Sequence, residues 1–291
     1  MRDLIGLLLE LNLALAGSVG FVAGLRGLFR QWFGPRAAYG LWWAVPVALV
    51  AVCIPREGAL SGSGGLGLFA AREVQIGLVS IWVVGILTSA LAMVVAQRRF
   101  AALERRGEAG PALIGVLVGR LVMPADADRR WSLEEVALIR AHERAHRERG
   151  DLRVNAVVAG LRCLFWFNPL AHVVAGMLRF DQELACDATV MAGRPGRRRL
   201  YAEALLKAGS ESVTPFGCGW TQGGVAALEA RLQALRLRCG SPSSAGLLFT
   251  VAVLAVTAGA AWRIQPPTPD APRARPGIVL NLRLLPPVQA R

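Results

Sequence analysis

The sequence is organised around HERAH at residues 142–146, an HExxH pattern. This stretch lies within a run, residues 131–150, that has the signals of a helix. Ser132 with Glu135 three positions later predicts a capping box at its start. Gly150 is a suitable residue for its end. The sequence therefore places the HExxH pattern on one well-delimited helix.

The two histidines of this pattern predict a metal site. His142 and His146 are four residues apart, so both imidazoles project from one face of the helix and can bind one zinc ion. Glu143 can reach a water molecule on that ion and act as the catalytic residue. A charged, solvated helix face is the alternative. Because two of only three His in 291 residues lie here, we expect one zinc ion per chain.

A catalytic zinc ion needs a third protein ligand and keeps one position open for water. Glu183 and Asp187 are also four residues apart. On a helix one of these carboxylates can bind the metal, while the other accepts the free N–H of a ligand His. The spacing leaves open which does which, and an ordinary acidic helix surface is a further alternative. His172 is a weaker candidate, and the five Cys, without a CxxC, predict neither a disulfide framework nor a Cys-based metal site.

Three separated blocks resemble the membrane-embedded metallopeptidases typified by the β-lactam-sensing BlaR/MecR receptors, peptidase family M56. The blocks are HERAH with the nearby RGD (142–151), FWFNPL (165–170) and ELACD (183–187). The resemblance covers about Pro111 to Leu206, and residues 111–124 are similar to the family's strand segment before the zinc helix. It implies a gluzincin-like HExxH…ExxxD site in which Glu183 is the third zinc ligand and Asp187 orients a ligand His.

The composition predicts a membrane protein. Hydrophobic residues make up 54%, charged residues 18%, and the mean hydropathy is +0.44. We expect a mainly α, multi-pass protein with four transmembrane helices and a zinc-metallopeptidase α+β domain between the third and fourth. The spans are expected at about residues 4–25, 38–54, 74–96 and 245–262. The net charge of +13 comes from Arg clusters between the spans, which indicates topology and not direct nucleic-acid binding.

The same pattern gives the expected domains and their orientation. They are a membrane domain at 1–97, a peptidase domain at 98–244, a fourth helix at 245–262 and a proline-rich tail at 263–291. The basic loops 26–37 and 98–106 are predicted to be cytoplasmic. The peptidase domain would then be cytoplasmic, with the N-terminus and the tail outside a bacterial inner membrane.

Two further segments bear on this layout. Residues 154–180 are apolar enough to suggest a fifth span, which would separate Glu183 from the histidines. The proline of Asn168-Pro169 favours instead two helices, 154–165 and 170–185, that fold back. Residues 111–123 predict a short hairpin or edge strand, which either pairs with an extended substrate or only packs against the zinc helix.

The resemblance implies a zinc endopeptidase that transduces a signal by cleaving a cytoplasmic protein or itself. A small winged-helix repressor is the expected substrate, with the lipid bilayer and a second copy of the chain as other partners. An HtpX-like quality-control protease and a catalytically silent scaffold with structural zinc are the alternatives. The receptors carry a penicillin-binding domain with an S-x-x-K serine. Here Ala204 stands three residues before Lys207, the single Lys, so we expect no such sensor domain.

The placement of the arginines can be tested with a reporter that is active only in the periplasm. Fused after Arg106 it should be silent, and fused after Arg263 it should be active, because short basic loops stay in the cytoplasm. Activity after Arg106 would invert the orientation and place the HExxH segment outside the cell.

Overall fold

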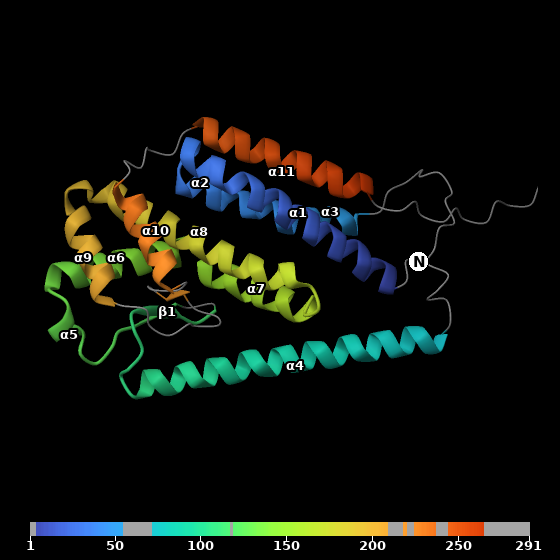
Figure 1. Ribbon diagram of the computed structural model, residues 1–291, viewed down its shortest axis with the longest axis horizontal. Helices are drawn as coiled ribbons and strands as arrows, with labels where there is room; N and C mark the ends of the chain where they lie inside the picture. Colours follow the sequence, from blue (N-terminus) through green and yellow to red (C-terminus); the bar gives the residue numbers. More distant parts are fainter. Residues whose placement is uncertain are drawn as a thin grey trace, which may run out of the picture.

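The computed structural model describes residues 4–54, 72–116, 119–208, 218–219, 224–236 and 244–264. The proline-rich tail beyond Ile264 and most of the loop expected at 55–73 lie outside these residues. The described part is mostly helical, with one small sheet (Figure 1).

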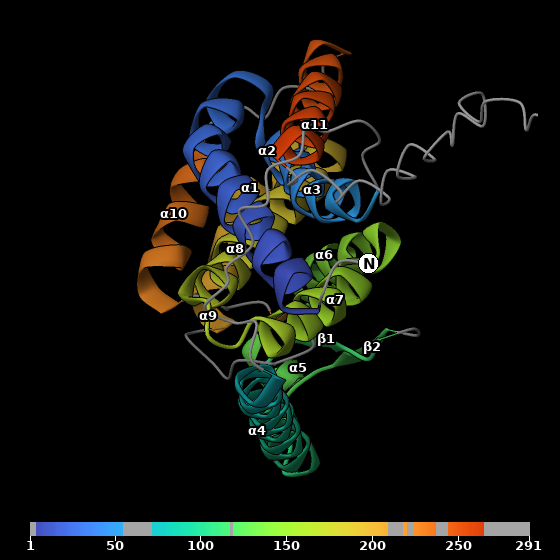
Figure 2. The ribbon, with the colours of Figure 1, turned by 90° about the vertical axis from the view of Figure 1, so that its right-hand side faces the viewer.

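Four helical stretches of the described part are long and apolar enough to cross a membrane. They are α1 (Leu4–Phe33), the run α2–η1–α3 (Pro35–Gly40, Leu41–Trp43, Ala44–Cys53), α4 (Arg72–Arg105) and α11 (Ser244–Ile264). Helix α3 packs against both α1 and α11. Helix α4 lies apart from these three, with α7 (Asp151–Leu164) and α8 (Pro169–Gly193) between (Figures 1 and 2).

The first helix is longer than the sequence predicted. We expected a span that ends at Leu25 and a basic loop after it, but α1 continues to Phe33. Arg26 and Arg30 belong to this helix, and each guanidinium contacts the buried carboxylate of Asp181 in α8, at 3.0 and 3.3 Å. The segment expected to be a loop is helical, and its Arg26 and Arg30 side chains form ion pairs with Asp181 of α8 where a loop would leave them solvated.

The apolar run 154–180 is divided between α7 and α8, as expected. The side chain of Asn168 caps α8, because its Oδ1 accepts a hydrogen bond from the backbone N–H of Leu170 at 2.8 Å. Pro169 occupies the first helical position, where its missing N–H has no cost. Helices α7 and α8 pack against each other. The predicted break is confirmed, and α8 extends beyond the expected end at residue 185 to Gly193.

Helix α4 is attached to α7 by two tryptophans. The indole N–H of Trp82 donates to the carbonyl of Leu164 at 2.9 Å, and that of Trp166 donates to the carbonyl of Trp82 at 3.3 Å. Gly85 allows this approach, since a Cβ placed there would lie 2.0 Å from the Trp166 ring.

The HExxH pattern lies on α6 (Leu133–Arg149), and its predicted ends are confirmed. Ser132 Oγ accepts from the Glu135 N–H at 3.3 Å, and the Glu135 carboxylate accepts from the Ser132 N–H at 2.7 Å. Gly150 follows with φ 74°, a left-handed conformation that glycine adopts without strain. Helix α6 packs against α8 and against α9 (Arg198–Ala208), which fixes one face of the helix over α8.

A three-stranded antiparallel sheet lies beside α6. Strands β1 (Ala112–Ile114) and β2 (Arg120–Val122) form the hairpin expected at 111–123. Strand β3 (Cys218–Gly219) pairs with the other side of β1, so the order is β2-β1-β3. Within the described residues β1 is therefore a central strand and β2 an edge strand, so the pairing of this hairpin with an extended substrate stays a prediction. The short helices α5 (Ala127–Arg130) and η3 (Pro195–Arg197) and helix α10 (Gly224–Arg236) complete this end of the molecule.

The capping box gives a testable pH dependence of stability. Glu135 is buried and accepts two hydrogen bonds from Lys207 Nζ, at 2.6 and 2.8 Å. Burial acts to raise the pKa of Glu135, but Lys207 and Ser132 outweigh it and lower the pKa below its ordinary value. A lowered folded-state pKa stabilises the fold above the unfolded pKa, and this stability is lost as pH falls through the folded pKa.

Glu135→Gln in metal-free protein should therefore lower the free energy of unfolding by about 1–2 kcal/mol at pH 7. The difference from wild type should shrink as the pH falls below 4.5, the ordinary pKa of the group. Thermal unfolding in detergent measures both effects. Glu134→Gln, at an exposed neighbouring position, is the control. If Glu135→Gln lowered the free energy of unfolding equally at pH 7 and below pH 4.5, the ionised Glu135 would not be the stabilising group.

Candidate metal centre

Helices α6 and α8 bring three of the expected residues to one point. The Nε2 atoms of His142 and His146 lie 3.0 Å apart. Glu183 Oε2 lies 3.2 Å from Nε2 of His142, and Glu183 Oε1 lies 3.2 Å from Nε2 of His146. All three side chains are buried. His172 is elsewhere: it is exposed and its Nε2 contacts the carbonyl of Trp166.

The outer nitrogens of the two histidines are held so that the inner ones face this point. His146 Nδ1 lies 2.7 Å from Asp151 Oδ2, and since a carboxylate only accepts, the hydrogen-bond network assigns the proton to Nδ1. His142 Nδ1 lies 2.7 Å from the oxygen of Tyr201, whose own hydroxyl donates to Asp187 Oδ1 at 2.6 Å. Nδ1 of His142 is then the donor to Tyr201. Both Nε2 atoms are left as lone-pair donors for a cation.

The spacing of these donor atoms fits zinc. In a tetrahedral site with metal–ligand bonds of about 2.0–2.1 Å, neighbouring ligand atoms lie about 3.3 Å apart. The Nε2 atoms of His142 and His146 lie 3.0 Å apart, and each lies 3.2 Å from a different oxygen of Glu183. Two imidazoles and a carboxylate are also a donor set that zinc accepts. The residues present thus fit one zinc ion with a fourth position left over.

The charge buried around this point also calls for a cation. Four buried carboxylates contact or adjoin it, and two guanidinium groups pair with them; these are Glu143, Asp151, Glu183 and Asp187 with Arg149 and Arg231. With all six ionised, the formal charge is minus two. A divalent cation would balance this excess. Without one, burial raises the pKa of Glu143 to about 7, so that protonation of this carboxylate reduces the charge.

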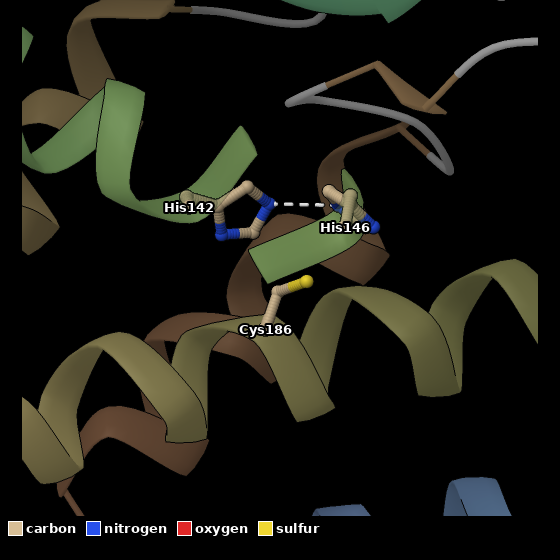
Figure 3. Close-up of side chains that lie close together, drawn as sticks. All are labelled: His142, His146 and Cys186. Atoms are coloured by element: carbon tan, nitrogen blue, oxygen red, sulfur yellow. Dashed lines mark hydrogen bonds between the residues drawn. The ribbon is translucent and has the colours of Figure 1, made fainter. Parts of the chain in front are cut away.

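A cysteine that the sequence did not single out lies at the same point. Figure 3 shows Cys186 extending from α8 towards the gap between the two imidazoles. Its Sγ and one nitrogen of each of the two histidines all lie within 4.8 Å of one another. A His/His/Cys group is therefore a possible metal site, contrary to the expectation that no Cys is involved. Burial raises the pKa of the Cys186 thiol to about 11, which favours the protonated thiol.

Arg231 of α10 is a central residue that sequence reasoning missed. Its Nη1 lies 2.9 Å from Glu183 Oε2, and its Nε and Nη2 donate to the two oxygens of Asp187 at 2.8 and 2.7 Å. Burial acts to raise the pKa of both carboxyls, but Arg231 lowers that of Glu183 well below its ordinary value and that of Asp187 to about 2. The signal in the sequence was an arginine on the apolar face of an amphipathic helix, between Leu228 and Leu235.

Glu143 differs from the other carboxylates of the cluster because it makes no hydrogen bond to the described residues. It is 2% exposed, and neither oxygen has a hydrogen-bond partner within the described part of the chain. Burial raises its pKa to about 7, despite the opposing effect of His146 and His142. A group that changes protonation near neutral pH suits proton transfer. The role of Glu143 as the catalytic base stays a prediction, and its burial and raised pKa are compatible with it.

Asp151 and Tyr201 were also missed as site residues. Asp151 was quoted only as part of a sequence block, yet its carboxylate holds His146. Tyr201 is one of two tyrosines in the chain and bridges His142 to Asp187. Asp187, expected to orient a ligand His, lies 3.2 Å from Nδ1 of His142. The structure thus brings all five expected residues together, while their chemical roles stay predictions.

Comparison with known proteins agrees with this geometry. The family model of the BlaR1 peptidase M56 matches residues 107–235, the segment that holds α6, α8 and α10. Residues 107–235 of this chain thus resemble the BlaR1/M56 peptidases. It is similar to the regulatory protein BlaR1 of Bacillus licheniformis, with 29% identity over 98 residues, or 33% of this chain. The match spans only 16% of that relative's length.

The match to the M56 family model has limited but definite content. M56 peptidases are metallopeptidases that generally use zinc, and the family assignment together with the apolar helices indicates a membrane-associated metallopeptidase or signal transducer. The His142/His146 pair and the carboxylate beside it lie within the matched segment.

The role of Asp187 can be tested by metal affinity. Asp187→Asn keeps the shape of the side chain but weakens the hydrogen bonds that hold His142, Tyr201 and Arg231. Zinc binding should weaken by about 10–100-fold, as is usual for groups behind a metal ligand. Competition with a coloured chelator measures it, with Glu203→Gln as the control because the Glu203 side chain is exposed and pairs with the exposed Arg199. Unchanged affinity would remove Asp187 from the site.

Proposed function

We propose that this chain is a membrane-embedded zinc endopeptidase that transduces a signal by regulated cleavage of a cytoplasmic repressor or of itself. The observation that carries the proposal is the convergence of His142, His146 and Glu183 beside Glu143, whose carboxylate has no hydrogen-bond partner among the described residues. This arrangement lies in the segment matched by the M56 family. The four apolar helices support a membrane location.

The residues have distinct tasks in peptide hydrolysis. His142, His146 and Glu183 would hold the zinc ion, which when bound acts as a Lewis acid and lowers the pKa of a water molecule. Glu143 takes a proton from the attacking water and returns it to the leaving amine. A base of this kind needs a free oxygen, and both oxygens of Glu143 are free of partners within the described residues. Asp187 keeps His142 in the tautomer that presents Nε2.

Burial of the site favours regulated cleavage over constitutive quality control. His142 and His146 are 0% exposed, and Glu143 and Glu183 are 2% exposed. We infer that a peptide reaches these atoms only after a change of conformation. Such a conformation is expected of an enzyme that waits for a signal, and less of an HtpX-like protease that degrades damaged proteins continuously.

The remaining parts of the proposal follow the arginine pattern and the family. The peptidase segment would face the cytoplasm of a bacterial inner membrane, with a small winged-helix repressor as substrate and a second copy of the chain as a candidate partner. Because the chain spans only 16% of the matched relative's length, that relative's activity is not transferred directly.

One observation favours a second candidate function, a silent membrane scaffold with structural zinc. Cys186 Sγ is close enough to His142 and His146 to bind the same ion. Together with Glu183 it would complete four protein ligands, and a closed four-ligand site is structural and not catalytic.

Paired variants separate the two functions. Glu143→Gln should keep near-stoichiometric zinc and lose turnover by about 100-fold or more, because only the base is removed. Glu183→Gln should lose zinc and activity together, since a neutral amide is a poor ligand. Cys186→Ala should keep both if the site is catalytic. Metal analysis and cleavage of the partner repressor or of the chain itself are the measurements.

Three outcomes would contradict the roles proposed for these residues. Zinc lost from Glu143→Gln but kept by Glu183→Gln would show that the two glutamates are assigned the wrong way round. Zinc lost from Cys186→Ala would favour the scaffold. Turnover that is unaffected by Glu143→Gln would remove the catalytic base.

A further inference from the structure

Asp151 links one of the membrane helices to the metal centre. Its carboxylate is 0% exposed and has three partners. His146 Nδ1 and the Arg149 guanidinium contact Oδ2, and the Tyr39 hydroxyl donates to Oδ1 at 2.8 Å. His146 and Arg149 belong to α6, but Tyr39 belongs to α2, within one of the apolar stretches able to cross a membrane.

The Tyr39 side chain is fixed on each side. Its oxygen accepts from Nε2 of Gln182 at 3.3 Å, so the hydroxyl proton is directed to Asp151. The Arg149 guanidinium lies 4.8 Å from the centre of the Tyr39 ring and also donates to the backbone carbonyl of Gln182 at 3.0 Å. Tyr39 thereby contacts Arg149 of α6, Asp151 of α7 and Gln182 of α8. Asp151 contacts His146, and Gln182 precedes Glu183 in the sequence.

An independent set of contacts holds the membrane helices in this position. Asp181 of α8, two residues before Glu183, is 1% exposed. It accepts from Arg26 and Arg30 of α1 and, at 2.8 Å, from the indole N–H of Trp42. Charged groups buried between helices are costly unless they are paired, so these contacts fix α8 relative to α1 and η1.

We propose that Tyr39 is a positioning residue of the metal centre, by which the membrane segment α2 sets the orientation of His146 through Asp151. The proposal rests on the zinc site described under the proposed function. Without the Tyr39 hydroxyl, Oδ1 of Asp151 loses its donor in a buried place, and the carboxylate reorients to find another. His146 then no longer presents Nε2 at the position that the metal requires.

The test is the metal affinity of full-length protein in detergent. Tyr39→Phe removes one oxygen and keeps the ring beneath Arg149. Its zinc dissociation constant should rise about tenfold, the lower end of the range for groups behind a metal ligand. The visible spectrum of the cobalt-loaded variant should differ from that of wild type, because the geometry around His146 changes.

Two controls separate positioning from damage to the fold. Thr250→Val removes a buried hydroxyl from α11 close to Gly40, where it bonds only its own helix, and should leave affinity and spectrum unchanged. Asp181→Asn weakens the ion pairs between α8 and α1 and leaves the contacts of Asp151 intact. It should lower the thermal midpoint of metal-free protein but raise the zinc dissociation constant less than Tyr39→Phe does.

The outcomes are distinguishable. Wild-type protein that binds no zinc overturns the proposed function and this inference with it. Wild-type zinc binding together with an unchanged Tyr39→Phe overturns the inference alone. Parallel losses of stability and affinity in Tyr39→Phe and Asp181→Asn also overturn it, because Tyr39 would then act only through the fold. A tenfold loss of zinc affinity in Tyr39→Phe with the changed cobalt spectrum, larger than the loss of affinity in Asp181→Asn, supports it.

Discussion

The excess of negative charge buried between α6 and α8 is the constraint on which the rest of the arrangement depends. Carboxylates are stable away from water only when they are paired, hydrogen-bonded or bound to a cation. Arg231 and Arg149 enter from different helices to supply part of that compensation. The inward-facing nitrogens of His142 and His146 mark where the remaining positive charge belongs. The helices around the site are positioned by these pairings as much as by apolar packing.

Features that depend on neighbours in the sequence were predictable. The capping box of Ser132 and Glu135 and the left-handed Gly150 each follow from a few adjacent residues. The break at Asn168-Pro169 does as well. The four apolar stretches were also found, although Arg26 and Arg30 were assigned to a loop because their partner Asp181 is 151 or more positions away.

Partners that are distant along the chain were not predictable from one sequence. Arg231 is 44 positions from Asp187, and Tyr39 is 112 positions from Asp151. Periodicity places an arginine on a helix face but does not say which carboxylate it meets. The proximity of Cys186 to the histidines has the same cause, since its position is set by the crossing of α6 over α8. Sequence reasoning misses those site residues that are brought together by the fold and have no characteristic spacing in the sequence.

The pairing of Tyr39 with Asp151 has a consequence for work with fragments. A fragment that begins after the third apolar stretch contains every proposed zinc ligand but neither Tyr39 nor Arg26 and Arg30. In such a fragment Asp151 and Asp181 would be exposed to water. Asp151 would lack its hydrogen bond from Tyr39, and Asp181 would lack its ion pairs with Arg26 and Arg30. Inhibitors selected against such a fragment would recognise a pocket that the intact protein closes with its own membrane helices.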